Sequence, residues 1–303
     1  MDKTDLVLSL LLLANSRTSF RELGEKTGLS VPAVHKRIQA LRDAGVLRAF
    51  TARVSMFSLN AITILILGKS EAAPIEGVHE KLGAHESVYW VTHAGGNYLV
   101  VGAYLRSISE MDACVAFVKA EAKMPDPTVA IVSLFPSPAE APLTRLDYRI
   151  IAALHKDSRI PISEVAEKVG VSAKTASRRL SRMVANALVE LSVEWYPDAA
   201  NDIMTFYQLY LRPGTDARTA GARLLNKYGP NVLFFYAFSN LPNLIVTMVW
   251  TPSMRELKEI QAGFESEGLF ENIVPNVLYT GYIFDTWRDT LLMERAKSAD
   301  RRG

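Results

Sequence analysis

Residues 21–41, "RELGEKTGLSVPAVHKRIQAL", and residues 163–183, "SEVAEKVGVSAKTASRRLSRM", are two versions of one pattern. Each has a short apolar helix, a turn of Gly, a hydrophobic residue and Ser, and a second helix rich in Lys and Arg. A shift of 142 positions aligns residues 16–34 with 158–176 without a gap, and it also places Arg37 on Arg179. A self-match at a fixed period indicates an internal repeat, so the fold contains this unit twice.

Local signals predict the same three helices in each copy. Gly28 and Gly170 stand where a helix ends in the left-handed conformation that glycine tolerates. Ser30 and Ser172 follow two residues later and are suited to cap the next helix. A β-prone stretch after each third helix is expected to form a small wing, so each copy predicts a winged helix-turn-helix domain. In the first copy the helices are expected near residues 4–15, 20–27 and 31–43.

A second pattern follows each helical copy in the order strand, helix, strand, strand, helix, strand. This βαββαβ order predicts a ferredoxin-like antiparallel sheet with two helices on one face. The elements are expected at residues 61–68, 75–85, 87–93, 97–106, 109–123 and 128–135. Their counterparts are expected at residues 204–212, 216–228, 232–239, 244–251, 254–267 and 273–283. The fold class is therefore α+β, with two helix-turn-helix domains alternating with two ferredoxin-like domains.

These patterns divide the chain into six segments. Three prolines within residues 136–142 predict a semi-rigid connector between the two halves. The expected segments are 1–53 (winged helix-turn-helix), 54–135 (ferredoxin-like), 136–142 (linker), 143–196 (second winged helix-turn-helix), 197–285 (second ferredoxin-like) and 286–303 (C-terminal helix and basic tail).

The composition is that of an ordinary globular protein, with 49% hydrophobic and 22% charged residues in 303. The net charge is only +2, so any affinity for nucleic acid must come from local patches. The single cysteine excludes a disulfide framework, and the five histidines are scattered without metal-ligand spacing. No phosphate-binding glycine loop or nucleophile elbow is present. We therefore expect no enzymatic activity, cofactor or metal.

Residues 6–14, "LVLSLLLLA", are similar to the apolar core of a signal peptide. Nine residues cannot span a bilayer, and the similar stretch at residues 147–154 lies in the chain interior. The run is therefore expected to be a core helix of the first domain. No membrane association is expected, and the predicted location is the cytoplasm.

The third helix of each copy carries the clearest functional signal. In a three-helix unit of this type, that helix enters the major groove of DNA with its early residues at the base edges. The second copy carries four basic residues and no acidic one in residues 172–185, which favours contact with phosphates. Arg37, Arg42, Arg178, Arg179 and Arg182 are expected to contact phosphates, and His35, Lys36, Lys174 and Ser177 the bases. The full predicted interface also includes Ser30, Val31, Ala33, Arg48, Ser172 and Thr175.

The wing of the second copy differs from the first. Glu190 and Glu194 stand there, whereas the first wing has Arg48 and basic neighbours. These acids are expected to repel phosphate, so the second copy is predicted to bind DNA less tightly than the first.

The segment "SRTSFRELGEKTGLSVPAVHKRIQALRDAGVL" (residues 16–47), followed by the βαββαβ pattern, resembles the leucine-responsive regulator/AsnC (Lrp/AsnC) family of transcription regulators. The resemblance covers nearly the whole chain, taken twice. It implies sequence-specific binding of double-stranded DNA, sheet domains of the RAM type that pair with each other, and regulation by a small effector. Family members act as dimers, so the chain resembles a dimer fused into one polypeptide whose two sheets pack together. Further self-association through the sheets is also implied.

The resemblance places an effector near the turn between the second and third strands of each sheet. This turn usually carries an acidic residue, but "AGGNYL" (94–99) and "NLPNLI" (240–245) have Asn at that position. Asparagine supplies no negative charge for an α-amino group, which leaves open a different effector or none. The predicted effector-binding residues are His93, Gly95, Gly96, Asn97, Asn240 and Asn243.

Two alternatives remain open. Siroheme decarboxylases share this architecture and carry a Thr-His-Asn-Tyr segment on the second strand. Here Thr92 and His93 match, but Ala94 and Gly95 follow, and "YAFSNLPN" (236–243) has no histidine. The other alternative is a protein-interaction module that has lost DNA binding, because a fold does not fix a function.

Overall fold

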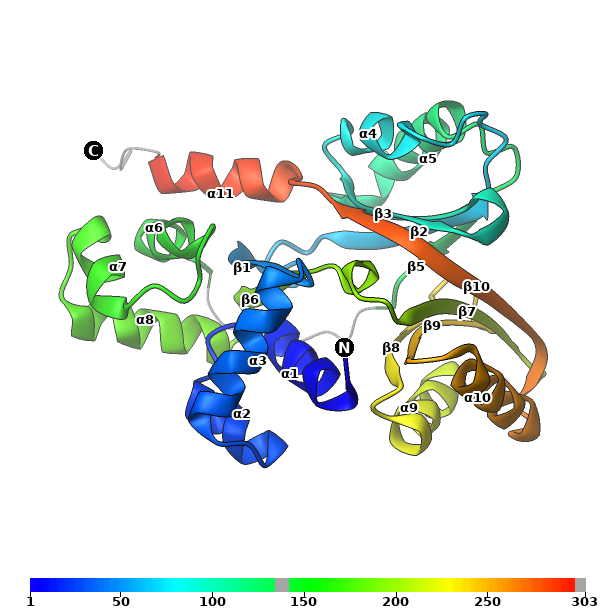
Figure 1. Ribbon diagram of the computed structural model, residues 1–303. Coiled ribbons are helices and arrows are strands. Elements are labelled where there is room, and N and C mark those ends of the chain that lie inside the picture. Colours follow the sequence, from blue (N-terminus) through cyan, green and yellow to red (C-terminus); the bar gives the residue numbers. More distant parts are fainter. Residues whose placement is uncertain (134–141, 298–303) are drawn as a thin grey trace. The chain divides into compact units, whose positions relative to one another are not determined.

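The computed structural model describes residues 1–133 and 142–297 (Figure 1). Most of the predicted linker and the last six residues of the predicted tail lie outside the described residues. The chain forms two compact units, each built from both halves of the repeat. The sheet unit comprises residues 1–7, 62–133 and 196–284, and the helix-turn-helix unit comprises residues 8–61, 142–195 and 285–297.

The two helical copies form where the repeat predicts them. Ser30 and Ser172 cap α3 and α8 by accepting hydrogen bonds from the backbone N–H of Ala33 and Thr175, at 3.4 and 3.2 Å. Gly28 and Gly170 end α2 and α7 with φ values of 71° and 70°. The helices are α1 (Lys3–Ala14), α2 (Phe20–Thr27), α3 (Val31–Asp43), α6 (Arg145–Leu154), α7 (Ile162–Val169) and α8 (Ala173–Ala185).

The predicted wings are not separate. The strands β1 (Leu47–Val54) and β6 (Val189–Trp195) pair with each other in an antiparallel two-stranded sheet that joins the two copies. In the register of this ladder Thr51 lies opposite Ser192 and Ala52 opposite Leu191. Each copy thus contributes one strand to a wing that the two copies share, because each β-prone stretch satisfies its backbone hydrogen bonds with its repeat partner.

The Ser-Arg dipeptide that matches between the copies forms the interface between them. The hydroxyls of Ser16 and Ser158 lie 2.6 Å apart and are buried. Arg17 donates from its Nη1 to the carbonyls of Ser158 and of Ile160, the latter at 2.9 Å. Arg159 donates in return to the carbonyl of Ser16 at 2.6 Å. The contacts are reciprocal, as expected for a two-fold interface retained inside one chain.

We predict that Arg17→Ala and Arg159→Ala each destabilise the pairing of the two copies. Each arginine is about half buried and bonds to backbone carbonyls of the opposite copy, and hydrogen bonds to charged groups contribute about 1.5–3 kcal/mol. Each variant should lower the free energy of unfolding by roughly that amount in urea titrations. Arg21→Ala is the matched control, because Arg21 is 85% exposed and pairs only with Glu25 on its own helix. Equal effects of Arg17→Ala and Arg21→Ala would contradict the interface.

The sheet unit contains two βαββαβ halves. Helices α4 and α5 cover the first half, and α9 and α10 cover the second (Figure 1). The first half consists of β2 (Ile62–Lys69), α4 (Val78–Gly83), β3 (Val88–Ala94), β4 (Tyr98–Leu105), α5 (Met111–Glu121) and β5 (Thr128–Ile131). The second consists of β7 (Ile203–Leu211), α9 (Ala217–Tyr228), β8 (Val232–Ala237), β9 (Leu244–Thr251), α10 (Met254–Ser266) and β10 (Phe270–Ile283). The predicted ferredoxin-like order is confirmed in both halves.

The two halves share one continuous eight-stranded sheet. The strand order is β5-β2-β4-β3-β10-β7-β9-β8, and the long β10 joins the halves by pairing with both β7 and β3. At the other end, Val132 and Phe238 form a bridge that connects β5 to β8. Buried side chains of both halves, including Leu65, Val100 and Phe206, pack against one another in a shared core. The two halves thus form a pseudo-dimer, as the repeat predicts.

The predicted C-terminal helix is α11 (Trp287–Lys297), which lies beside α6 in the helix-turn-helix unit (Figure 1). Its first turn repeats that of α6. The carboxylate of Asp289 accepts from the backbone N–H of Thr286 at 2.8 Å, and Asp147 accepts from Thr144 at the same distance. These two pairs are 142 positions apart, so the repeat extends into α11. In the parts of the chain that the structure describes, no helix is long and apolar enough to cross a bilayer.

Candidate nucleic-acid interface and ligand sites

The helices α3 and α8 present the same face in the two copies. Val34, Ile38 and Leu41 of α3 are buried, as are Ala176, Leu180 and Met183 of α8. These residues recur at helical spacing and fix which face turns outward. The exposed positions include Val31, His35 and Lys36 on α3, and Lys174, Ser177 and Arg178 on α8.

The other predicted residues of the first copy have partners within the domain. The guanidinium of Arg42 is exposed and lies 5.7 Å from the ring centre of Phe50, a cation–π contact. The ring of His35 meets that of Phe20 edge-on, with centres 5.5 Å apart. Arg48 is exposed, whereas Arg37 and Ala33 are partly buried. Ser30 is exposed but its hydroxyl is occupied in capping the helix.

Two of the predicted phosphate contacts of the second copy instead pair with a buried acid. Asp147 is fully buried, and its two carboxylate oxygens accept from Arg179 at 3.1 Å and from Arg182 at 2.7 Å. Both guanidinium groups are about one-third exposed. One carboxylate balances only one of the two charges, so this pair keeps a net positive charge, and its predicted contact with phosphate stays a prediction. Lys174 and Arg178 have no ion-pair partner within residues 142–297 and remain available.

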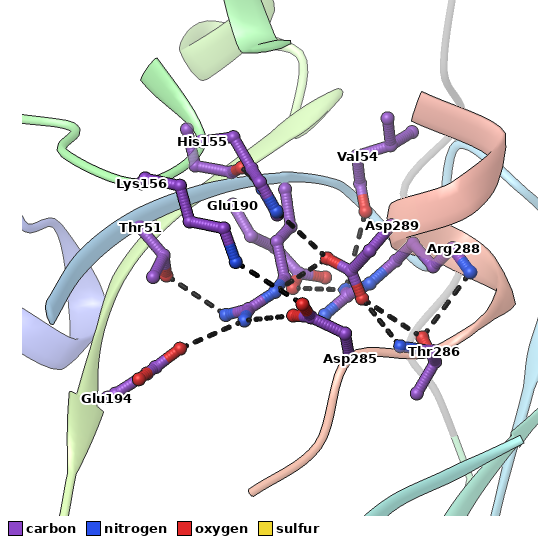
Figure 2. Close-up of polar contacts among 12 residues, drawn as sticks. Thr51, Val54, His155, Lys156, Glu190, Glu194, Asp285, Thr286, Arg288 and Asp289 are labelled. Atoms are coloured by element: carbon purple, nitrogen blue, oxygen red, sulfur yellow. Dashed lines mark hydrogen bonds and ion pairs between the residues drawn. The ribbon is translucent and has the colours of Figure 1, made fainter. Parts of the chain in front are cut away.

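The acids of the second wing also have partners. Glu190 contacts Arg288 at 2.7 Å, and Glu194 contacts Arg53 at 3.2 Å (Figure 2). Arg53 and Arg288 are almost fully buried, with side chains 5% and 1% exposed. Both acids therefore pair with buried arginines, which reduces the negative charge that they present on the wing. The weaker binding of DNA by the second copy stays a prediction.

Asp289 of α11 is at the centre of this network. Its carboxylate contacts Arg53 Nε at 3.0 Å and accepts from the backbone N–H of Thr286 (Figure 2). Burial raises the pKa of the Asp289 carboxyl, but Arg53, the hydrogen bond from Thr286 and Arg288 together outweigh burial. The pKa therefore lies below its ordinary value and the group is a carboxylate at neutral pH.

The same network contains a set of potential metal ligands. His155, Asp285 and Asp289 offer three ligand atoms within 4.8 Å of one another. Arg53 already contacts Asp289 at 3.0 Å and Asp285 at 3.5 Å, and Lys156 contacts Asp285 at 3.2 Å. The carboxylates are thus balanced by protein cations, which leaves no charge for a metal to neutralise.

The predicted effector residues do not come together in one site. Gly95, Gly96 and Asn97 form a short 3₁₀ turn, in which Gly96 and Asn97 adopt left-handed φ values of 67° and 59°. The side-chain amide of Asn240 accepts from Ile131 N–H and donates to the Val129 carbonyl, both at 2.8 Å. Both of its side-chain polar atoms thus have partners in the segment that includes β5, and a role of Asn240 in binding an effector stays a prediction.

Asn243 lines a cavity of about 580 Å³ that both halves of the sheet unit form. We call it the axial cavity, because it lies where the ends of β2 and β7 meet the starts of β4 and β10. At its base the buried Gln208 donates to the hydroxyl of Tyr98 at 2.9 Å and accepts from Tyr210 at 3.4 Å. Burial raises the pKa of Tyr98 to about 12. The lining residues are Leu67, Gly68, Lys69, Tyr98, Asp126, Thr128, Gln208, Tyr210, Asn243, Glu271, Asn272 and Val274.

Three charged side chains surround the axial cavity. Lys69, Asp126 and Glu271 are exposed, and none of them forms an ion pair with another described residue. One positive and two negative groups around a partly apolar base suit a small molecule that carries both charges. These residues carry no signal of a site in the sequence, because the cavity exists only where the two halves meet.

The fold and the exposed helices define a tandem winged helix-turn-helix protein, and comparisons with known proteins agree. Residues 143–184 match the AsnC-type helix-turn-helix domain, and residues 1–48 match a winged helix-turn-helix DNA-binding domain. An HTH-type transcriptional regulator of Pyrococcus furiosus is 33% identical over 106 residues, which cover 35% of this chain and 72% of that protein. LrpA of Pyrococcus horikoshii is 28% identical over 102 residues, which cover 33% of this chain and 72% of LrpA. The chain belongs to the Lrp/AsnC family, with two family units in tandem.

A solved structure shares the architecture of the whole chain. The siroheme decarboxylase NirDL superposes with a TM-score of 0.62 over 97% of this chain and 98% of that chain. The sequence identity is 16%, so this likeness concerns the fold alone.

Proposed function

We propose that this protein is a DNA-binding transcriptional regulator of the cytoplasm and has no enzymatic activity. The observation that carries the proposal is the exposure of basic side chains at equivalent places on α3 and α8. Lys36 and Arg178 are aligned in the repeat, both are exposed, and neither has an ion-pair partner among the described residues. Lys174 adds a third such charge on α8. Helices of this class place those positions against DNA.

The two copies present different side chains to DNA. At the aligned exposed positions the first copy has Pro32 and His35, and the second has Lys174 and Ser177. A homodimer would read two identical half-sites, whereas this chain would read two different ones. We therefore propose an asymmetric operator.

The test is retention of random genomic duplex fragments by the purified protein at two salt concentrations, followed by sequencing. We expect an asymmetric motif and an affinity that falls steeply as salt rises. If no fragment is retained at either concentration, the chain does not act through DNA, and the protein-interaction alternative replaces this proposal.

We further propose that an effector binds in the axial cavity and not at the hairpin turns. Lys69 can pair with a carboxylate, while Asp126 and Glu271 can pair with an ammonium group, so the cavity has the charges that Asn97 and Asn243 lack. Gln208 can reorient its amide toward a ligand, because its present partners are hydroxyls.

We predict that one or more of the twenty standard amino acids stabilises the protein, and that Gln208→Leu abolishes this effect. A ligand at about 100 times its Kd adds about 2.7 kcal/mol, which melting experiments detect readily. Asn240→Ala is the control and should respond like the wild type, because Asn240 does not line the cavity. Stabilisation that survives Gln208→Leu would place the effector elsewhere.

The tetrapyrrole alternative has one supporting feature, the half-buried His93 after Thr92 on β3. An absorbance titration with siroheme tests it directly. A saturable spectral change that is lost in His93→Ala would favour this alternative over the regulator.

A further inference from the structure

Two histidines that are fourteen positions apart in the sequence meet in the sheet unit. His79 lies on α4 and His93 on β3, and their ring centres are 5.9 Å apart. The ring of Tyr282, from β10, stacks on His79 with centres 3.5 Å apart and planes only 12° from parallel. Tyr282 also meets His93 edge-on at 5.9 Å. Three elements therefore hold the two imidazoles against each other.

Each imidazole has a buried nitrogen without a hydrogen-bond partner. These atoms are Nδ1 of His79 and Nε2 of His93. A buried polar atom that lacks a partner is destabilising, so two such atoms on two rings in contact call for a physical reason. In the tautomers that leave both of these nitrogens unprotonated, one shared electrophile would satisfy both.

The protonation state of His93 suits such a role. Burial lowers the pKa of His93 and the neighbouring His79 lowers it further, against a smaller opposing effect of Glu76. Burial penalises the charged imidazolium, so the ring is neutral at pH 7 and its nitrogen can donate electrons. The influence of Glu76 also locates a carboxylate near the pair.

The cluster of His155, Asp285 and Asp289 is a useful comparison, because its carboxylates already pair with positively charged side chains of the same chain. There Arg53 and Lys156 supply the positive charge. In the surroundings of His79 and His93 that the structure describes, no Lys or Arg pairs with either ring. The cluster of His155, Asp285 and Asp289 is thus paired with positively charged side chains. Among the described residues, the pair of His79 and His93 is not.

We propose that His79 and His93 bind one divalent metal ion of the borderline class, such as Zn²⁺, Ni²⁺ or Cu²⁺. Imidazole nitrogen is a favoured ligand of these ions. Zn–N bonds are about 2.0–2.1 Å, so two imidazoles that share one ion have ring centres about 5 to 6 Å apart, as found here. The remaining positions stay open to water or to an exogenous ligand.

The test is calorimetric titration of the metal-free full chain with Zn²⁺, together with the visible spectrum after addition of Co²⁺. We expect one equivalent to bind, and His79→Ala and His93→Ala each to weaken binding at least tenfold. His85→Ala is the matched control. His85 follows α4, packs on Phe117 with ring centres 4.7 Å apart, and uses Nδ1 to accept from Ser87 N–H.

Thermal melting separates loss of the site from loss of the fold. Zn²⁺ should raise the melting temperature of the wild type and of His85→Ala, and should not raise that of His79→Gln or His93→Gln. The glutamine variants keep a side chain that can form hydrogen bonds, so they preserve folding. Failure of the wild type to bind either metal, or equal binding by the histidine variants, would overturn the proposal. DNA retention by these variants is measured separately, so this outcome leaves the regulator proposal unaffected.

Discussion

Replacing Asp289 by Ala is expected to lower the free energy of unfolding of the helix-turn-helix unit by about 3 kcal/mol, because it removes the most buried carboxylate that contacts Arg53 and leaves the charge of this buried arginine incompletely balanced by Glu194 and Asp285. Arg53 is 5% exposed and Asp289 7% exposed, and their atoms are 3.0 Å apart. The substitution also removes the carboxylate that accepts from the backbone N–H of Thr286 at the start of α11. Urea titration followed by circular dichroism measures the change.

Lys156→Ala is the matched control for this prediction. Lys156 pairs with Asp285 at the edge of the same network, but its side chain is 75% exposed. Exposed ion pairs contribute at most about 1 kcal/mol, so this variant should be nearly as stable as the wild type. Arg53→Met combined with Asp289→Leu should recover much of the loss, because a pair of apolar side chains removes the unpaired charge. Equal stability of Asp289→Ala and Lys156→Ala would show that the network contributes little.

The network also predicts the response to acid. The folded-state pKa of Asp289 lies below its unfolded value, so its contribution is fully present above the unfolded pKa of about 3.9. The contribution is lost as the pH falls through the lower folded pKa. The wild type should therefore lose more stability than Asp289→Ala between pH 5 and the acid limit, as urea titrations at several pH values would show.

The triple substitution Lys36→Ala, Lys174→Ala, Arg178→Ala should remove most of the DNA affinity. Each phosphate contact contributes about 0.9 to the slope of log K against log salt, so loss of three contacts should reduce the slope by roughly 2–3. Fluorescence anisotropy with one duplex over a range of salt concentrations measures this slope. If these side chains contact phosphates, the loss of affinity should be similar for duplexes of unrelated sequence, because phosphates are the same in all of them.

A control substitution outside α3 and α8 distinguishes direct contact with DNA from a general effect of charge, and it is compared with Lys36→Ala alone, which also removes one positive charge. Lys258 lies on α10 of the sheet unit and is also exposed. Lys258→Ala changes the net charge without touching α3 or α8, so it should leave the salt slope unchanged. An unchanged slope in the triple variant would exclude these three side chains from the interface. Arg179→Ala should instead lower mainly the free energy of unfolding, because Arg179 pairs with the buried Asp147.

Most of the fold was predictable from the sequence because local signals and the repeat agreed. The serine caps and terminal glycines defined α2, α3 and α8, and the aligned copies supported each other. The pairing of β1 with β6 was not predictable, because a β-prone stretch does not specify its partner. The repeat of 142 positions also gave no sign that the matching Ser-Arg pairs, which begin at Ser16 and Ser158, form the interface between the two copies.

The site was predicted less completely than the fold. Composition could identify α8 as basic. It could not show that the buried Asp147 pairs with Arg179 and Arg182, because that depends on which face of α6 turns inward. The pairing of Glu190 and Glu194 with buried arginines was not predictable, because those arginines lie about 100 to 140 positions away. His79 and His93 fit no ligand-spacing rule, since different elements of the fold bring them together. The sequence did offer one signal of buried charge. An aspartate stands in the first turn of both α6 and α11, at Asp147 and Asp289, and both carboxylates are buried.

The bridge between Val132 and Phe238 has a consequence for the behaviour of the protein at high concentration. Because it lies where the first and last strands of the sheet order approach each other, it covers part of the edges of β5 and β8. A covered edge is a poorer template for a strand from another molecule, the usual start of edge-to-edge aggregation and fibril growth. Edge-to-edge growth should therefore be less favourable there than at the outer edges of β1 and β6, which pair only with each other in the described two-stranded sheet.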